Sequence, residues 1–481
     1  MNTSARRPKL EEAKAKVLAM QTKLHHWAVN DETRCFDDLF NLACDPAFLI
    51  VAWDQVSHNK GACTPGVDGR SPRSIDNVDV FLDELRDDLK TRRFTPKPVQ
   101  QKMIPKANGK LRKLGIPTVE DRVVQASLKL VIEPIFEADF KPCSYGFRPM
   151  RRAQDAIAEI HYFGSGVRNY EHVLEGDIEA CFDNIDHAAL MGRIRRRVGD
   201  KRILLLIKAF LRAGILDEKG LDRKTITGTP QGGVLSPLLA NIALSVLDEH
   251  FTRKWEALGP YWTRAKRRRE GTPICRLIRY ADDFVVMVAG THEDAKALRN
   301  EIATVLAAVG LSLSEAKTKV CNLDEGFDFL GWRIQRRRQR GRGGKRQVYT
   351  YPSKKSLISV MGKVRFHTRR KRNRTLATLL QSLNRTLRGW CNYFRHGVSS
   401  RTFGYIDHFS WWRIVGWLRK RHQKLNWGTL RRRFLPGWEI RDGRTEMFRP
   451  NRLNIKRYRY RGARILNPWT IPTAASDASV A

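Results

Sequence analysis

The sequence is poor in the features that mark secreted and membrane proteins. It holds eight cysteines in 481 residues, and the closest two, Cys35 and Cys44, are nine positions apart. That spacing excludes a zinc site of the CxxC type and offers no disulfide framework, so we expect a reducing cytosol. No stretch approaches the roughly 18 apolar residues of a membrane-spanning helix, which predicts no membrane partner. Residues 1–18 lack the apolar core of a secretory signal, and Glu11 and Glu12 make them too acidic for a transit peptide.

Acidic residues are scarce in the last third of the chain. Gly331–Ala481 holds 38 basic and 5 acidic residues, whereas the first 330 residues hold 51 and 45. Eight of the twelve tryptophans also lie in that third. Cations interleaved with aromatic rings suit a polyanion that offers phosphates to neutralise and bases to stack on. A merely solvated surface of this charge would repel itself, so the sequence predicts nucleic-acid binding.

The apolar spacing predicts a mixed α+β fold, in which helices cover a small antiparallel sheet. Helices are expected within 1–60 and over 78–89, 119–135, 188–198, 202–211, 237–251 and 295–309. Strands are expected over 173–178, 275–280, 284–288, 312–320 and 327–334.

The basic last third is expected to be helical and to follow a hinge. Three helices are predicted there, over Ser356–Val364, Thr375–Phe394 and Ile406–His422. Gln335–Gln347 is basic and contains glycine, which favours a hinge. The chain from Leu425 is rich in arginine and lacks periodicity, so we expect a separate small module.

Three acidic side chains stand where strands are expected to end. Asp282 and Asp283 lie at the tip of a tight hairpin, and Asp177 ends a strand 105 residues upstream. Aspartate is common in turns, so the adjacent pair alone is a weak signal. Acids from a strand and a hairpin can hold two divalent ions about 4 Å apart, and Mg²⁺ prefers such oxygen ligands. Two such ions would activate a primer 3′-hydroxyl and neutralise a leaving pyrophosphate.

A glycine-containing loop, Thr229–Pro237 (TPQGGVLSP), lies between these acids. Its glycines let the backbone approach a base pair or sugar, and its second proline suits a helix start. The loop alone could arise by chance. The order of the three features, in a chain of this charge, indicates a nucleic-acid polymerase.

With these blocks the sequence resembles the group II intron-encoded reverse transcriptase/maturase family, over residues 35–425. Further blocks carry the resemblance: Thr64–Gly69, Ile104–Pro117, Cys143–Pro149 (CSYGFRP), Leu313–Thr318, Phe329–Trp332 and Leu383–Arg395. The resemblance implies a right-hand polymerase with fingers and palm, followed by an α-helical thumb/maturase domain. The expected parts are an N-terminal helical extension (1–75), fingers and palm (76–335), thumb/maturase or X domain (348–424), a basic segment in the place of a DNA-binding region (425–470) and a disordered tail (471–481).

The resemblance also assigns roles to residues at the reaction centre. It makes Asp177, Asp282 and Asp283 the catalytic ligands of two Mg²⁺ ions, with the Ile178 carbonyl as a backbone ligand. The nucleotide-binding residues would be Lys106, Arg112, Phe182, Gln231 and Lys317. The two cations Lys106 and Arg112 would grip the triphosphate, unless they are only surface charges.

Three other assignments each leave an alternative open. Phe182 would stack under the deoxyribose and exclude a 2′-hydroxyl, although it could be a core residue. Lys317 would protonate pyrophosphate, although an ordinary surface lysine fits as well. The primer grip would be Phe329, Leu330, Gly331 and Trp332, although these could form a core strand. The RNA-binding residues would be Arg385, Arg388, Trp390, Tyr393 and Arg395.

The implied function is an RNA-directed DNA polymerase that binds its own intron RNA and assists splicing and mobility. Its partners would be that RNA, a DNA target and primer, and dNTPs, in a bacterial cytoplasm. There is no cysteine after Cys391, so we expect no HNH endonuclease domain. Two other functions stay open: a splicing factor without polymerase activity, and a domesticated polymerase in phage defence or DNA repair.

Overall fold

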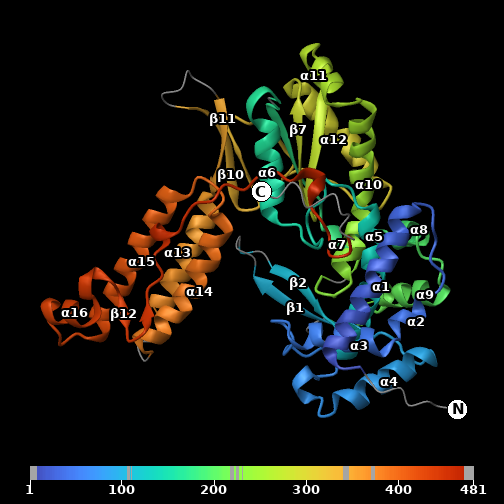
Figure 1. Cartoon of the computed structure of the whole chain (residues 1–481), viewed down its shortest axis with the longest axis horizontal. Coiled ribbons are helices and arrows are strands. Elements are labelled where there is room, and N and C mark those ends of the chain that lie inside the picture. The colour runs from blue at the N-terminus through green and yellow to red at the C-terminus, as the bar shows by residue number, and fades with distance from the viewer. Residues whose placement is uncertain are drawn as a thin grey trace.

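The structure, a computed structural model, combines helices with several small sheets (Figure 1). It describes residues 8–105, 109, 111–168, 170–216, 222–223, 227–229, 231–339, 346–369 and 374–470. Lys106 and the tail after residue 470 lie outside these ranges. Within them, no helix combines the length and the apolar character needed to cross a membrane.

A four-stranded antiparallel sheet, here called the central sheet, has the strand order β6-β7-β3-β8. Its strands are β3 (His172–Asp177), β6 (Ile274–Tyr280), β7 (Asp283–Ala289) and β8 (Lys319–Asn322). The prediction for 275–280 and 284–288 is confirmed. The strand expected over 312–320 is wrong for most of its length, because the segment before Lys319 forms turns apart from one bridge between Ile178 and Leu313.

Both faces of the central sheet are covered, because neighbouring side chains of each strand enter different cores. Leu174 and Val286 pack with helices α10 (Ser236–Ala257) and α12 (His292–Ala307). Val173, Val285 and Met287 pack on the other face with α6 (Ala153–Gly164). Burial on both faces explains the nearly continuous apolar sequence of β7.

The N-terminal helices belong to the same core. α1 (Leu10–Asn30) and α3 (Pro46–Ser57) pack against α5 (Val119–Asp139). A second sheet, of order β2-β1-β4-β5, projects beside them as a hairpin of β1 (Val99–Pro105) and β2 (Leu111–Ile116). The remaining elements of this half are α2 (Phe40–Ala43), α4 (Val78–Lys90), α7 (Cys181–Asn184), α8 (His187–Arg195), α9 (Lys201–Arg212), α11 (Tyr261–Arg269), β4 (Ile215–Leu216) and β5 (Asp222–Arg223).

After residue 326 the chain forms a three-stranded sheet and then an arm of helices. The sheet has β9 (Phe327–Phe329), β10 (Trp332–Arg338) and β11 (Arg346–Pro352). The prediction of a hinge over Gln335–Gln347 is wrong at both ends, because Arg337 pairs with Gln347 in the β10–β11 ladder. The helical arm comprises α13 (Lys354–Arg369), α14 (Leu376–Phe394), α15 (Ser400–Arg421) and α16 (Trp427–Phe434), and it extends away from the central sheet in Figure 1.

The chain after the arm does not form a separate module, contrary to the prediction. The hairpin of β12 (Arg441–Asp442) and β13 (Thr445–Glu446) is held on the arm by Asn384, whose amide donates to the Glu446 carbonyl. Residues 449–469, here called the C-terminal strap, then run back across the molecule (Figure 1).

Two contacts fix the strap to distant parts of the chain. Arg461 donates two hydrogen bonds of 2.9 Å to Asp155 of α6. The indole of Trp469 donates to Gln21 of α1 at 3.2 Å. The strap therefore ties the helical arm to both ends of the body.

We predict that Trp469→Ala releases the end of the strap. Trp469 is 4% exposed, and truncating a buried aromatic side chain costs about 3 kcal/mol. Trypsin should then cleave the arginines near residue 460 faster than in the wild type. Leu466→Ala, at a side chain that is 64% exposed, is the control and should leave the rate unchanged. Equal cleavage of all three proteins would contradict the anchoring role.

Candidate active site

The β6–β7 hairpin brings the three predicted acids together. Tyr280 pairs with Asp283 across the hairpin, which leaves Ala281 and Asp282 as its two-residue tip. Asp177, at the end of β3, pairs with Asp283 on the other side. Residues more than 100 positions apart in the sequence thus meet at one edge of the central sheet.

The tip of this hairpin is strained and braced from behind. Ala281 has a φ of 58°, a left-handed conformation that costs free energy in a residue with a side chain. The backbone of Gly146, in the CSYGFRP block, lies against it: a Cβ at position 146 would be 2.3 Å from the Ala281 nitrogen. Glycine is required there by the close approach of the two backbones.

A buried ion pair holds this brace in place. Arg279 and Asp248, both fully buried, share two hydrogen bonds of 2.8 and 2.5 Å. The same guanidinium donates to the Ala281 carbonyl at 2.9 Å and to Asn241 at 3.0 Å. Asn241 in turn donates to the Gly146 carbonyl at 2.9 Å. One charged group thus links α10, the CSYGFRP loop and the hairpin tip.

Negative charge accumulates in front of the brace. Asp283 is exposed, but the surrounding protein displaces water, and together with the charges of Asp282 and Asp177 this raises its pKa to about 6. Two lysines oppose that rise. Lys317 lies 2.6 Å from Asp177, and this hydrogen bond raises the pKa of the Lys317 ammonium group. Lys355, in the first turn of α13, also lowers the pKa of Asp283.

The oxygen atoms at this edge of the central sheet are ligands of the kind that Mg²⁺ prefers. The side chains are three carboxylates that repel one another, and a cation between them would relieve that repulsion. Ile178 directly follows Asp177 and forms an isolated bridge with Leu313, and its part as a backbone ligand stays a prediction. Among the described residues, no three metal-ligating side chains already converge on one point.

Two of the predicted nucleotide-binding residues contact each other. Arg112 on β2 donates to the Gln231 side chain at 3.0 Å, and the Gln231 carbonyl accepts from Gly115 at 2.7 Å. Phe182, in α7, is 9% exposed and joins the main core, while its carbonyl accepts a hydrogen bond from Thr229. The TPQG loop therefore bridges the β1–β2 hairpin and the segment that follows Asp177.

The predicted primer grip forms the joint between the central sheet and the helical arm. Phe329 and Trp332 are buried, and Leu330 and Gly331 form the turn between β9 and β10. The Leu330 carbonyl accepts a hydrogen bond from the Tyr393 hydroxyl of α14 at 2.8 Å. The side chains of Phe329 and Trp332 are therefore core residues, as expected if these positions form a core strand.

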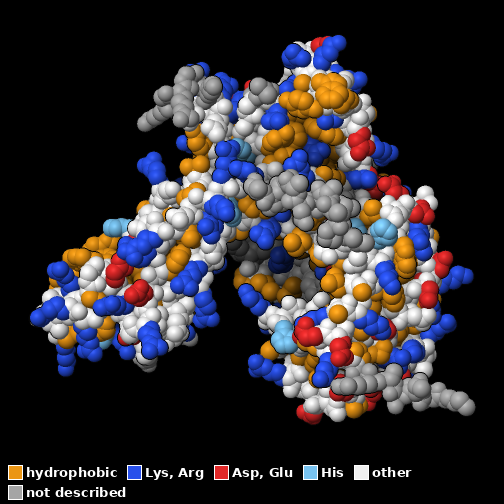
Figure 2. Space-filling model, in the orientation of Figure 1, with side chains coloured by type: hydrophobic (Ala, Val, Ile, Leu, Met, Phe, Trp, Pro, Cys, Tyr) orange, Lys and Arg blue, Asp and Glu red, His pale blue; other side chains and the backbone are white. Residues whose placement is uncertain are grey.

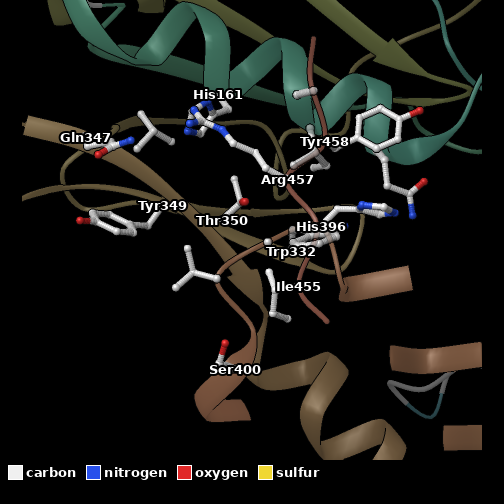
Figure 3. Close-up of a pocket in the computed structure, with 16 residues that line it drawn as sticks. His161, Trp332, Gln347, Tyr349, Thr350, His396, Ser400, Ile455, Arg457 and Tyr458 are labelled. Atoms are coloured by element: carbon white, nitrogen blue, oxygen red, sulfur yellow. The ribbon is translucent and has the colours of Figure 1, made fainter. Parts of the chain in front are cut away.

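A cavity of about 390 Å³ lies beside this joint (Figure 3). Its lining comes from α6, from β10 and β11, from the turn after α14 and from the strap, and Figure 3 shows His161, Trp332, His396 and Arg457 around it. The pKa of His161 is lowered by burial and by Arg457. The three acids do not line this cavity, so it belongs to the joint between body and arm.

Of the five predicted RNA-binding residues, four lie on α14 and Arg395 follows its last residue. Arg385 and Arg388 are exposed on the helix. Trp390 and Tyr393 instead face the protein: Trp390 packs on Phe394, and burial raises the pKa of Tyr393 to about 12. Arg395 is half-buried, and the strap residue Lys456 donates to its carbonyl. Only the first two offer exposed cations to a phosphate.

The sequence analysis missed the residues that support the site. Arg279 directly precedes the hairpin tip Tyr280–Asp283, and Gly146 lies within CSYGFRP, so those motifs carried a signal for the brace. Asp248 lies within α10, and no sequence motif marked it as a supporting residue. Lys355 stands beside one other lysine in a segment without a motif, and only the fold brings it near Asp283.

Comparison with known proteins agrees with this geometry. The model of the family "Reverse transcriptase (RNA-dependent DNA polymerase)" matches residues 104–334, and that of "Group II intron, maturase-specific domain" matches 358–435. The group II intron-encoded protein LtrA of Lactococcus lactis is 32% identical over 446 residues, which cover 78% of this chain and 73% of LtrA. The chain belongs to the group II intron reverse transcriptase/maturase family.

Other relatives extend this likeness. Protein YkfC of Escherichia coli is 38% identical over 370 residues, which cover 72% of this chain and 97% of YkfC. Nuclear intron maturase 1 of Arabidopsis thaliana is 26% identical over 307 residues, which cover 48% of this chain and 43% of that protein. The chain therefore carries a reverse transcriptase domain, an RNA-directed DNA polymerase, followed by a helical maturase domain.

We predict that Gly146→Ala disables this reverse transcriptase by displacing the hairpin tip. The new methyl group would push the hairpin tip outward, and a displacement of about 1 Å at a reaction centre costs about 100-fold in rate. Incorporation of dNTPs on a primed RNA template measures the effect. Gly192→Ala, where nothing lies near the added carbon, is the matched control and should retain activity. Wild-type rates in both variants would show that the brace is not needed.

Proposed function

We propose that this reverse transcriptase copies RNA into DNA by two-metal nucleotidyl transfer and binds its own group II intron RNA to assist splicing and mobility. The meeting of Asp177, Asp282 and Asp283 at one sheet edge, within a family of reverse transcriptases, carries the catalytic part. The maturase-specific domain carries the RNA part.

In this proposal the molecule is a right hand. The central sheet is the palm, the β1–β2 hairpin belongs to the fingers, and the helical arm is the thumb. Figure 2 shows the face between hairpin and arm as hollowed, with Lys and Arg side chains inside and along the arm. That shape and charge suit a primer–template duplex, whose phosphates need cations. The domain boundaries expected from the sequence remain part of the proposal.

The reaction centre divides its tasks among this chain's own residues. Two Mg²⁺ ions, held by the three aspartates and the Ile178 carbonyl, would activate the primer hydroxyl and stabilise the pyrophosphate. Arg112 and Lys106 would bind the triphosphate, and Gln231, held by Arg112, would contact the nucleotide. Lys317, beside Asp177, would hold a proton for the leaving pyrophosphate. Phe182 would set the floor under the sugar.

Splicing assistance would rest on other surfaces. The exposed Arg385 and Arg388 on α14 would contact phosphates, whereas the RNA itself would perform the splicing chemistry. A DNA role for the basic chain after residue 425 stays a prediction, and so does a bacterial cytoplasmic location. The three intact acids argue against a splicing factor without polymerase activity. Intron RNA domains encoded around the gene would separate a mobile intron from a domesticated polymerase.

We predict that Phe182→Val relaxes sugar selection. A smaller side chain would leave room for a 2′-hydroxyl, so ribonucleotide incorporation should rise at least about tenfold relative to dNTPs on a primed RNA template. Phe182 is also a core residue, so Phe251→Val, at a ring of similar burial on α10, controls for general loosening. An active Phe182→Val enzyme with unchanged dNTP preference would refute the role as a gate.

We also predict that the two activities separate. Asp282→Ala combined with Asp283→Ala removes the charges that hold metal, so DNA synthesis should fall by several orders of magnitude. The hairpin edge is partly exposed and loses mutually repelling charges, so the protein should fold and bind RNA as before. Splicing of the intron RNA and dNTP incorporation are measured in parallel at one salt concentration.

The converse variant completes that test. Arg385→Gln combined with Arg388→Gln removes exposed cations and should weaken splicing first, while polymerisation on a generic primed template suffers less. If the double aspartate variant folds but fails to splice, the proposed separation of the two activities is wrong.

A further inference from the structure

Helix α11 (Tyr261–Arg269) forms an exposed basic and aromatic surface that the polymerase site does not use. None of its residues is buried, and its last turn consists of Lys266, Arg267, Arg268 and Arg269. Its first turn exposes two aromatic side chains, Tyr261 at 50% and Trp262 at 72%. In Figure 2 hydrophobic side chains lie among Lys and Arg side chains at the top of the molecule, where Figure 1 places α11.

The fold does not require these side chains for packing. The helix is attached through Arg264, which lies 4.4 Å from the ring of Trp255. Lys266 and Arg269, spaced i and i+3, are like-charged neighbours on the helix, and the acid Glu270 lies 3.8 Å from Lys266. Such a surface is costly to keep without a partner of opposite charge.

One aromatic and two basic side chains lie along one stripe of the helix. Trp262, Lys266 and Arg269 are spaced i, i+4 and i+7, so they share one face, and all three are exposed. Beside this stripe, Tyr261 and Arg269 help line a hollow of about 500 Å³, which also contains the acid Glu171. Arg168 reaches the same edge, with its guanidinium 6.0 Å from the Tyr261 ring.

This arrangement discriminates between classes of partner. A ring followed by cations on the same face matches single-stranded nucleic acid, which offers both base faces and phosphates. A base-paired duplex keeps its base faces stacked. A membrane-surface helix needs a continuous apolar face, and the stripe of α11 interrupts its ring with charges.

The α11 surface is remote from the reaction centre. The chain leaves α11 at Arg269 and enters β6 at Ile274, whereas the catalytic tip follows Tyr280 at the other end of that strand. Seven residues of strand span about 20 Å, at about 3.3 Å for each residue. The helix therefore stands at the opposite end of the hairpin from Asp282 and Asp283, and it can hold RNA without entering the polymerase site.

We propose that α11, with Arg168 at its edge, is a second RNA-binding surface that docks an unpaired loop of the bound RNA on the outside of the palm. Trp262 stacks on a base, and Lys266 and Arg269 contact the flanking phosphates. The proposal deepens the RNA-binding role proposed above, since the partner is the same RNA at a different place.

The test compares two triple variants of the full-length protein. The first combines Trp262→Ala, Lys266→Gln and Arg269→Gln. The matched control combines Lys201→Gln, Leu205→Ala and Lys208→Gln on α9, which has the same i, i+4, i+7 spacing and the same loss of charge, with Leu205 65% exposed. Each protein is first saturated with unlabelled primer–template duplex to occupy the cleft. A single-stranded RNA of about 30 nucleotides containing 4-thiouridine is the probe.

The α11 variant should bind this probe about tenfold more weakly than the control, because a stacking platform and two phosphate contacts are lost. Its slope of log affinity against log salt should be shallower by about 1.4, at about 0.7 for each lost contact. In the wild type, crosslinked RNA should appear on the tryptic peptide Trp255–Arg264, which contains Trp262. Equal affinities and slopes for the two variants, or no adduct on that peptide, would overturn the proposal.

Two further measurements distinguish RNA docking on α11 from a failure of polymerase activity and from membrane binding. DNA synthesis on a separate primed template should be the same in the α11 variant as in the wild type. If the wild type itself made no DNA, that result would contradict the proposed function and leave the α11 proposal untouched. Vesicles containing phosphatidylserine test the membrane alternative. Loss of vesicle binding in the α11 variant with RNA affinity intact would overturn RNA docking in favour of a lipid surface.

Discussion

The buried pair of Arg279 and Asp248 is the interaction on which the geometry of the reaction centre depends. Neither charge reaches water, so each requires the other, and losing one partner would leave the other uncompensated. The guanidinium also holds the Ala281 carbonyl at the strained hairpin tip. A buried ion pair is a poor source of net stability, but its fixed geometry makes it a good means of orientation. Here it positions the peptide that immediately precedes Asp282.

The reaction centre in front of this pair is electrostatically incomplete. The surrounding protein displaces water from Asp283, and the charges of Asp282 and Asp177 repel it, so its pKa is raised to about 6. Lys317, just before β8, and Lys355, in the helical arm, both lower the pKa of Asp283 and so offset part of that repulsion. The protein thus gathers unfavourable negative charge at the edge of the central sheet where the proposed function places its metal ions. The arm contributes to that balance, so its position affects the acids as well as the nucleic acid.

The parts of the structure that were predicted correctly are those defined by local pattern. β6 and β7 follow from two apolar runs around a two-residue turn, and their pairing places Asp282 and Asp283 at the tip. The strand expected over 327–334 covers β9 and the start of β10, but the rest of the β10–β11 hairpin was missed because its strands are charged. The course of the strap was missed for another reason: Arg461 meets an acid 306 positions away, and no local pattern encodes such a contact.

The distribution of cations now has a physical explanation that the total charge does not supply. The arm carries much of the charge along one side of the hollow, while α11 carries a smaller, concentrated patch at the far end of the β6–β7 hairpin. A duplex in the hollow needs cations along its backbone. It does not explain an exposed tryptophan at the outer end of the palm. An RNA held at both places would stay bound while the hollow exchanged one primer–template for another. Separate surfaces for holding the RNA and for copying a template are what a protein with both activities requires.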